Sequence, residues 1–296
     1  LSKQLESAMP IAHLNGIDIN YEVHGDGTPL VLTHGYSATL EMWREQVPAF
    51  SAKYRLVIYD SRGHGKTTAP ADMNAYGLAR DYVADKLALM DHLGVEKAYV
   101  GGLSMGGMIA QEFALQHPGR VKALLLFDTG PGMSAMAQNS ERMAQFTKMR
   151  EMMQTVARTK GMSAIIDAMR NSPMALSPRA TGAALPEAAR RHVENMKQMS
   201  VDGYLGGSKA MQDWGGSLDR LHEITAPTLV LVGEQDHLLA ASQAIHSKIA
   251  GSRFVVLRNS GHGTNIWRPD AFSEETLDFL AAVDAGEPVD GEFVVP

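Results

Sequence analysis

The sequence predicts a doubly wound α/β fold, in which a mostly parallel β-sheet is flanked by helices and carries a helical insertion as a cap. Three observations predict it. Short apolar runs alternate with helical patterns in the first and last thirds of the chain. These runs are continuous rather than alternating, as expected of strands buried on both faces of a parallel sheet. Between them, residues 131–221 contain no strand-like run.

The first half of the chain contains a hairpin and then a regular alternation. Asn15 and Gly16 separate two strand-like runs, which is a pattern typical of a two-residue hairpin turn. Continuous apolar runs predict strands at residues 29–35, 54–60, 97–102 and 121–128. Helical patterns between them predict helices at residues 40–50, 76–93 and 105–116.

The sheet resumes after the insertion. We expect strands within residues 226–237 and 253–263, and helices at residues 239–249 and 269–283. The expected organisation is a core domain of residues 9–130 and 222–285, an insertion of residues 131–221, a C-terminal tail of residues 286–296, and a cloning remnant of residues 1–8 before a natural start at Met9. The tail is too short and rich in turn residues to form a domain.

The composition excludes several functional classes. The 296 residues are 45% hydrophobic and 20% charged, which is typical of a soluble globular protein with a large core. A formal charge of −6 without a basic block argues against a nucleic-acid partner. No apolar run approaches the roughly 20 residues that cross a bilayer, so we expect no membrane span.

Cysteine is absent, which excludes disulfides, thiolate zinc sites and a cysteine nucleophile. The eleven histidines show no metal-ligand spacing, so we expect no metal and no cofactor. The expected protein is a cytoplasmic monomer or homodimer.

Ser104 is the candidate nucleophile. It lies in Gly-Leu-Ser-Met-Gly, between a predicted strand and a predicted helix, and this context makes the motif informative. We expect strained dihedrals at Ser104, flanking glycines that avoid a collision, and a hydroxyl presented at the carboxyl end of the sheet beside a helix N-terminus. The alternative is a glycine-rich turn whose serine caps the helix.

A serine hydroxyl needs a base oriented by an acid. His262 and Asp236 lie in loops that follow two later strands, so both open at the edge that presents Ser104. The order Ser104, Asp236, His262 is the order that hydrolases with a nucleophile elbow use. Asp128, which ends the strand after the helix of Ser104, is the alternative acid.

Five segments in register resemble the α/β-hydrolase-fold serine hydrolases over nearly the whole chain apart from the insertion. They are "HGYS" (34–37), "DSRGHG" (60–65), "GLSMGG" (102–107), "GEQDH" (233–237) and "SGHG" (260–263). The resemblance implies catalysis by Ser104, Asp236 and His262. It also implies an oxyanion hole made by the backbone N–H groups of Tyr36 and Met105.

The same resemblance suggests structural roles for other residues. We expect His34 to brace the oxyanion loop, and Asp60 and Arg62 to be charge partners. The remaining histidines are interpreted as surface or loop residues: His13, His24, His92, His117, His192, His222, His237 and His246.

The insertion is rich in methionine, since 12 of the 18 methionines lie at positions 133–211, often at helical spacing. It leaves the sheet after Gly130 and returns before Pro227, so it should cover the edge where Ser104 opens. Turn signals near prolines interrupt it at Pro173, Pro178 and Pro186. Its inner face would form an adaptable apolar pocket with candidate substrate contacts at Trp43, Met133, Phe146, Trp214 and Trp267.

The expected activity is hydrolysis of an apolar carboxylic ester or lactone through an acyl-enzyme intermediate. The "GLSMGGM" stretch is similar to that of enol-lactonases and of methylesterases that act on polyketide products. Two alternatives use the same triad, namely C–C bond hydrolysis of a ring-cleavage product and cofactor-free perhydrolysis. A non-catalytic ligand receptor on this fold is the alternative from another class.

Overall fold

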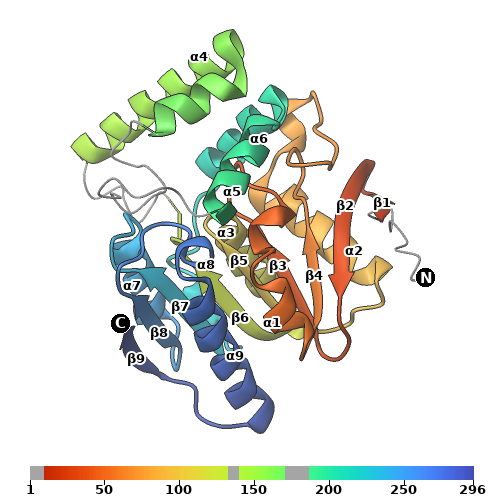
Figure 1. Ribbon diagram of the computed structural model, residues 1–296, viewed down its shortest axis with the longest axis vertical. Coiled ribbons are helices and arrows are strands. Elements are labelled where there is room, and N and C mark those ends of the chain that lie inside the picture. Colours follow the sequence, from red (N-terminus) through yellow and green to blue (C-terminus); the bar gives the residue numbers. More distant parts are fainter. Residues whose placement is uncertain (1–9, 133–139, 171–186) are drawn as a thin grey trace.

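The computed structural model describes residues 10–132, 140–170 and 187–296. These residues form a twisted sheet with the strand order β1-β2-β4-β3-β5-β6-β7-β8-β9 and with helices on both faces (Figure 1). The pairs β1–β2 and β2–β4 are antiparallel, and every other pair is parallel, which confirms the predicted fold class. The strands are β1 (Ile11–Leu14), β2 (Ile17–His24), β3 (Pro29–Thr33), β4 (Arg55–Tyr59), β5 (Ala98–Leu103), β6 (Val121–Phe127), β7 (Thr228–Gly233), β8 (Arg253–Leu257) and β9 (Gly291–Val295).

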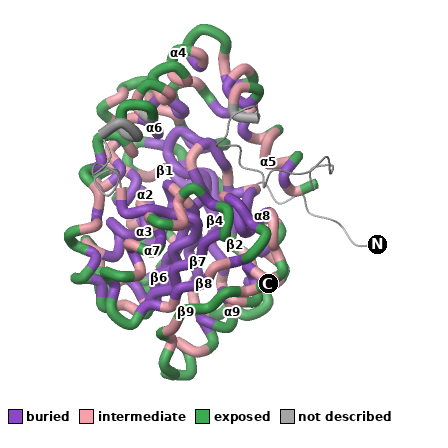
Figure 2. Tube along the Cα trace, turned by 90° about the vertical axis from the view of Figure 1, so that its left-hand side faces the viewer, coloured by how far each residue is buried: buried purple, intermediate pink, exposed green. Residues whose placement is uncertain are grey.

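Two apolar cores lie on the two faces of the sheet, and the central strands β3 to β7 between them are almost entirely buried (Figure 2). One core is covered by α2 (Val83–His92), α3 (Met105–Gln116) and α7 (Leu239–Lys248). The other is covered by α1 (Val47–Ser51) and α9 (Pro269–Ala285). Continuous apolar runs were the correct signal for these strands because side chains on both faces of each strand are buried.

The hairpin prediction is confirmed. Leu14 pairs with Ile17, so Asn15 and Gly16 form a two-residue loop. Both have positive φ, 51° and 75°, as this hairpin turn requires.

Two predicted helices begin differently from the expectation. The segment 40–50 divides into a 3₁₀ turn, η1 (Leu40–Trp43), and the short helix α1. Pro48 lies in the first turn of α1, where its missing N–H costs nothing, whereas it would break a continuous helix. The segment 76–93 opens with a π-helical turn at Leu78–Tyr82 before α2.

The C-terminal tail contains a strand that the sequence analysis did not predict. Strand β9 pairs in parallel with β8 at the edge of the sheet, from Arg253 opposite Gly291 to Leu257 opposite Val295. Phe293 and Val294 remain exposed, so the segment lacks the burial pattern on which strand prediction depends.

The helical insertion consists, in its described part, of α4 (Ser140–Arg170), α5 (Glu187–Lys197) and α6 (Val201–Asp213). These helices lie together at one end of the molecule (Figure 1). Gly161 breaks α4 with φ 76° and ψ −177°. A small core joins α4 and α6 through Ala157, Met162, Ile165, Met199, Tyr204 and Leu205. The proline turn signals at 173, 178 and 186, and residues 1–8, lie outside the described residues.

Lys86 on α2 is completely buried in the core. Its Nζ lies 3.5 Å from the carbonyl oxygen of Gly101 and 5.8 Å from the ring centroid of Phe113, and it has no carboxylate partner among the described residues. Burial lowers the pKa of Lys86 to about 7. In the unfolded chain this lysine has a pKa of about 10.4. Between about pH 7 and pH 10 the unfolded chain therefore binds more protons than the folded chain, so the free energy of unfolding should rise with pH over this range.

We therefore expect Lys86→Met to raise the free energy of unfolding at pH 6 by about 2–4 kcal/mol, because a buried charge is replaced by an apolar chain of similar length. The increase should shrink as the pH approaches 10. Urea unfolding at several pH values measures it, with exposed Lys53→Met as the matched control. An equal increase at pH 6 and pH 10 would contradict the buried-charge explanation.

Candidate active site

Ser104 lies on the sharp turn between β5 and α3, as expected. Its φ of 55° and ψ of −116° lie in a strained region for a residue with a side chain. The turn is fixed by backbone contacts, since the N–H of Ser104 donates to the carbonyl of Phe127 at 2.9 Å and its carbonyl accepts from the hydroxyl of Thr129 at 2.7 Å. The Ser104 hydroxyl makes no capping hydrogen bond to α3, which contradicts the helix-capping alternative.

The flanking glycines are required by close backbone approach. A Cβ on Gly102 would lie 2.3 Å from the carbonyl carbon and oxygen of Gly106. A Cβ on Gly106 would lie 2.2 Å from the carbonyl oxygen of Thr33 at the end of β3. The collision predicted for larger side chains is therefore confirmed, and it involves backbone that cannot move aside.

The loop after β3 lies directly beside Ser104, because a Cβ on Gly35 would be 3.5 Å from the Cβ of Ser104. Among the described residues, the backbone N–H groups of Tyr36 and Met105 donate no hydrogen bond. Met105 is the first residue of α3, where an unused N–H is normal and the helix dipole is positive. Two unused donors from neighbouring loops are available for an anionic oxygen.

His34 braces this loop, as the sequence analysis expected. Its Nε2 accepts the N–H of Ser61 at 2.9 Å, and its Nδ1 lies 2.8 Å from the carbonyl oxygen of Gly35. Burial lowers the pKa of His34 to about 4, so the ring is neutral at pH 7 and Nδ1 carries the proton that Gly35 accepts.

The loops after β7 and β8 bring Asp236 and His262 together. The Nδ1 of His262 lies 3.0 Å from Oδ2 of Asp236, while the other oxygen of Asp236 accepts the N–H of Leu238 at 2.9 Å. Burial alone would lower the pKa of His262, but the attraction of Asp236 outweighs it and raises that pKa. Burial alone would raise the pKa of Asp236, but the attraction of His262 lowers it. Asp236 therefore stabilises the imidazolium that forms when His262 takes up a proton.

The hydroxyl of Ser104 forms no hydrogen bond with His262 within the described ranges. Such contacts are often long in the absence of substrate and tighten in the reacting complex. Asp128, the alternative acid, does not bond to His262 either, since its carboxylate accepts from the backbone of Gly233, Gly263 and Thr264.

The expected substrate contacts divide into two groups, those that the structure corrects and those that stay predictions. Trp43 is completely buried in the core against Phe127 and Phe272, which corrects its assignment, because a side chain enclosed in the core does not face a substrate. Trp214 is also corrected, because it is buried and its indole N–H donates to Glu112 on α3 at 2.8 Å.

The remaining three expected contacts stay predictions. Trp267 is half-buried on α8 (Thr264–Trp267), five residues after His262. Met133 lies outside the described residues, and Phe146 lies in α4 with its side chain outside the described part.

His192 is a residue that the sequence analysis assigned to the surface. It lies on α5, which packs against η1 and α8, the elements that flank the oxyanion loop and the His262 loop. Burial and the charge of His262 together lower the pKa of His192 to about 4. The charge of His192 also contributes to the lowered pKa of His34. The buried residues Ala189 and Met196, three before and four after it, were the signal that could have placed it on the inner face.

Arg62 and Asp60 are not charge partners, which corrects that expectation. Arg62 makes a two-point contact with Asp85 on α2, at 2.7 and 2.8 Å. Asp60 instead accepts the N–H groups of Leu40 and Lys66, at 2.8 and 2.9 Å. It therefore fixes the loop that follows β4.

One group of possible metal ligands is present among the described residues. Ligand atoms of Asp236, His237 and His262 lie within 4.8 Å of one another. Because Nδ1 of His262 and Oδ2 of Asp236 are hydrogen-bonded at 3.0 Å, a cation there would compete with this hydrogen bond.

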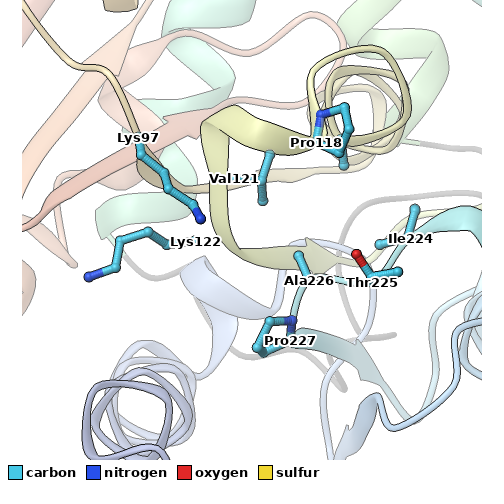
Figure 3. A pocket seen from close by; sticks show the side chains of 9 residues that line it. Lys97, Pro118, Val121, Lys122, Ile224, Thr225, Ala226 and Pro227 are labelled. Carbon is cyan, nitrogen blue, oxygen red and sulfur yellow. The ribbon is translucent and has the colours of Figure 1, made fainter.

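A cavity of about 220 Å³ lies at the opposite edge of the sheet, among Lys97, Val121 and Pro227 (Figure 3). Val121 begins β6 and Pro227 precedes β7, so this cavity is separated from Ser104 by the length of the strands. It is not part of the candidate site. No helix in the described ranges has the length and hydropathy that a membrane span needs.

The sheet is doubly wound, and a strained serine lies on a strand-to-helix turn at its carboxyl edge. These features define a class of α/β proteins that carry a nucleophile at this position. A family model of the alpha/beta hydrolase fold matches residues 28–269, and the chain belongs to this family. It is thus a hydrolase of the α/β fold.

Three similar proteins illustrate the range of the family. A solved hydrolase from Pseudomonas aeruginosa is 30% identical, with a TM-score of 0.78 over 94% of this chain and 100% of that one. The solved enol-lactonase of Burkholderia xenovorans is 28% identical, with a TM-score of 0.77 over 92% and 100%. A putative 2-succinyl-6-hydroxy-2,4-cyclohexadiene-1-carboxylate synthase of Bacillus subtilis is 27% identical over 90% of this chain and 96% of its own.

Proposed function

We propose that the protein hydrolyses a carboxylic ester or lactone of an apolar small molecule through an acyl-enzyme intermediate. The observation that carries the proposal is the Asp236–His262 pair, 3.0 Å apart, at the sheet edge where the strained turn presents Ser104. The similarity to an enol-lactonase of 28% identity supports the lactone as one substrate class.

The proposed mechanism has two half-reactions, the formation and the hydrolysis of the acyl-enzyme, and the same catalytic groups act in both. The Ser104 oxygen attacks the carbonyl carbon while Nε2 of His262 takes the hydroxyl proton, and the negative oxygen receives the N–H groups of Tyr36 and Met105. The imidazolium returns the proton to the leaving alcohol oxygen as the C–O bond breaks. Water then attacks the acyl-enzyme with the same base, which releases the acid and restores Ser104.

The substrate is proposed to be uncharged and apolar because of the insertion. The methionine-containing core of α4 and α6 packs against Tyr36, whose hydroxyl donates to the carbonyl of Tyr204 at 2.6 Å. Methionine side chains adapt to different apolar shapes. We propose that α4, α5 and α6 act as a cap over the site.

The proposal is tested by labelling with a fluorophosphonate probe, mapping of the modified peptide, and a panel of aryl esters and lactones of increasing chain length. We expect label on Ser104 and turnover that depends on chain length. Label elsewhere would overturn the mechanism, and equal turnover of short and long esters would overturn the apolar cap.

Three further measurements distinguish the alternative functions from ester or lactone hydrolysis. Cleavage of a vinylogous diketone, with no ester turnover, would favour C–C bond hydrolysis. Halide oxidation that requires peroxide and an acyl donor would favour perhydrolysis. Tight ligand binding without label or turnover would favour a receptor.

His192 supplies a prediction about substrate selection. A neutral imidazole at this edge should hydrogen-bond a polar group near the scissile carbonyl, so His192→Phe should lower kcat/KM for a hydroxyl- or keto-substituted ester about 3- to 10-fold. The matched alkyl ester should change less than about twofold, and exposed His222→Phe should change neither. Equal losses for both esters would contradict a selective contact.

A further inference from the structure

Asp128 receives an unusual set of donors for a residue outside the proposed triad. Its Oδ1 accepts the N–H of Gly233 at 3.1 Å. Its Oδ2 accepts the N–H groups of Gly263 and Thr264 at 3.0 and 2.7 Å, and the Thr264 hydroxyl at 2.8 Å. The residue is completely buried at the end of β6 and has a positive φ of 43°.

These donors come from the two loops that hold the Asp236–His262 pair. Gly233 ends β7, three residues before Asp236, and Gly263 directly follows His262. Gly233 has no room for a side chain, because a Cβ there would lie 2.5 Å from the carbonyl oxygen of Ser260. One carboxylate therefore connects both loops at the point where they touch.

The donor set selects for a carboxylate. Four donors and no acceptor point at the two oxygens, so an ionised acid satisfies all of them, whereas an amide would turn an NH₂ group toward at least one N–H. The positive φ of Asp128 agrees with this interpretation, because a residue with a side chain keeps such a backbone conformation only where the surrounding contacts hold it there.

We propose that Asp128 is a positioning residue that fixes the distance between Asp236 and His262 and adds negative charge behind the imidazolium. This rests on the proposed function. The titratable groups that face His262 are Asp236 and His237 from the loop after β7, Asp128 from the end of β6, and His192 from α5. Of these, both carboxylates raise the pKa of His262.

The test compares Asp128→Asn and Thr264→Val by kcat, KM, pH profile and the rate of fluorophosphonate labelling of Ser104. Asp128→Asn should lower kcat and the labelling rate about 10- to 100-fold, because small displacements of catalytic groups have effects of this size, with KM changed less than about threefold. Burial and the charge of Asp236 raise the pKa of Asp128 to about 7, so its negative charge is present above this pH and is lost below it. Asp128→Asn removes this charge, so the acid limb of kcat/KM should become less steep and move to lower pH by at most about half a unit. A merely structural role would leave this limb in place.

Thr264→Val removes one donor but keeps the charge, so kcat should fall about three- to tenfold, the size of one hydrogen bond, with the acid limb unmoved. If circular dichroism shows that Asp128→Asn does not fold, Thr264→Val still tests the proposal. Thr276→Val is the matched control, since its hydroxyl is equally buried but bonds to Phe272 within α9. Full kcat in either test variant overturns the proposal.

The outcomes separate this proposal from the one on which it rests. Wild-type protein that does not react with the probe would overturn the proposed function. Reaction that is equally fast in wild type and Asp128→Asn would overturn only the role of Asp128. If Asp236→Asn stays active while Asp128→Asn is inactive, Asp128 is the triad acid, and the positioning role is wrong.

Discussion

Replacing Ser104 by alanine is expected to lower kcat for the best ester of the panel by about 10⁴- to 10⁶-fold, because no other group can form the acyl-enzyme. KM should change little, since the hydroxyl is a reacting group rather than an anchor. The melting temperature should also change little, because alanine keeps the side chain small at the strained position. Steady-state kinetics and thermal unfolding measure the two quantities.

The control for this experiment is Ser247→Ala, which removes a hydroxyl on α7 that bonds only to the carbonyl of Ala244. This variant should keep the kcat of the wild type, and the fluorophosphonate probe should label its Ser104 as fully as in the wild type. More than about 1% residual kcat in Ser104→Ala, free of contaminating activity, would exclude Ser104 as the nucleophile.

The second large effect is expected on folding. Gly106→Ala should lower the free energy of unfolding by several kcal/mol, about 3 or more, because its Cβ would lie 2.2 Å from the carbonyl oxygen of Thr33 and 2.6 Å from that of His34. Relief requires α3 to move away from β3, which would also displace the Met105 N–H. Denaturant unfolding and the labelling rate of Ser104 test both consequences.

Gly119→Ala is the matched control, since no heavy atom lies within 4 Å of a Cβ built there and its φ is not positive. It should leave stability within about 0.5 kcal/mol of wild type. A stable, reactive Gly106→Ala would show that the approach of α3 to β3 is looser than the structure indicates.

The parts of the site that sequence could predict are those fixed by local geometry. The turn at Ser104 is marked in the sequence by glycines within two positions of it, and the loops of Asp236 and His262 follow strands whose parallel order puts their ends at one edge. Asn15 and Gly16 are predictable for the same reason, because the hairpin turn itself demands their φ values.

The parts that sequence could not predict depend on partners far along the chain. Arg62 has Asp60 two positions away, but it bonds to Asp85 on α2, because Asp60 is already occupied by backbone N–H groups. Trp43 was expected to face a substrate, but it is buried in the core beside Phe272, 229 positions later in the chain. The spacing of Ala189 and Met196 could have placed His192 on the inner face of α5, but the packing of α5 against η1 and α8 depends on residues far along the chain.

The close contact between Gly203 on α6 and Gly63 bears on how the proposed cap could move. A Cβ on Gly203 would lie only 1.8 Å from the carbonyl oxygen of Gly63, and Tyr36 is tied to the neighbouring Tyr204. Helix α6 is therefore held closely against the loop after β4. In the proposed cap, adjustment to substrate size would then come from α4, which is interrupted at Gly161.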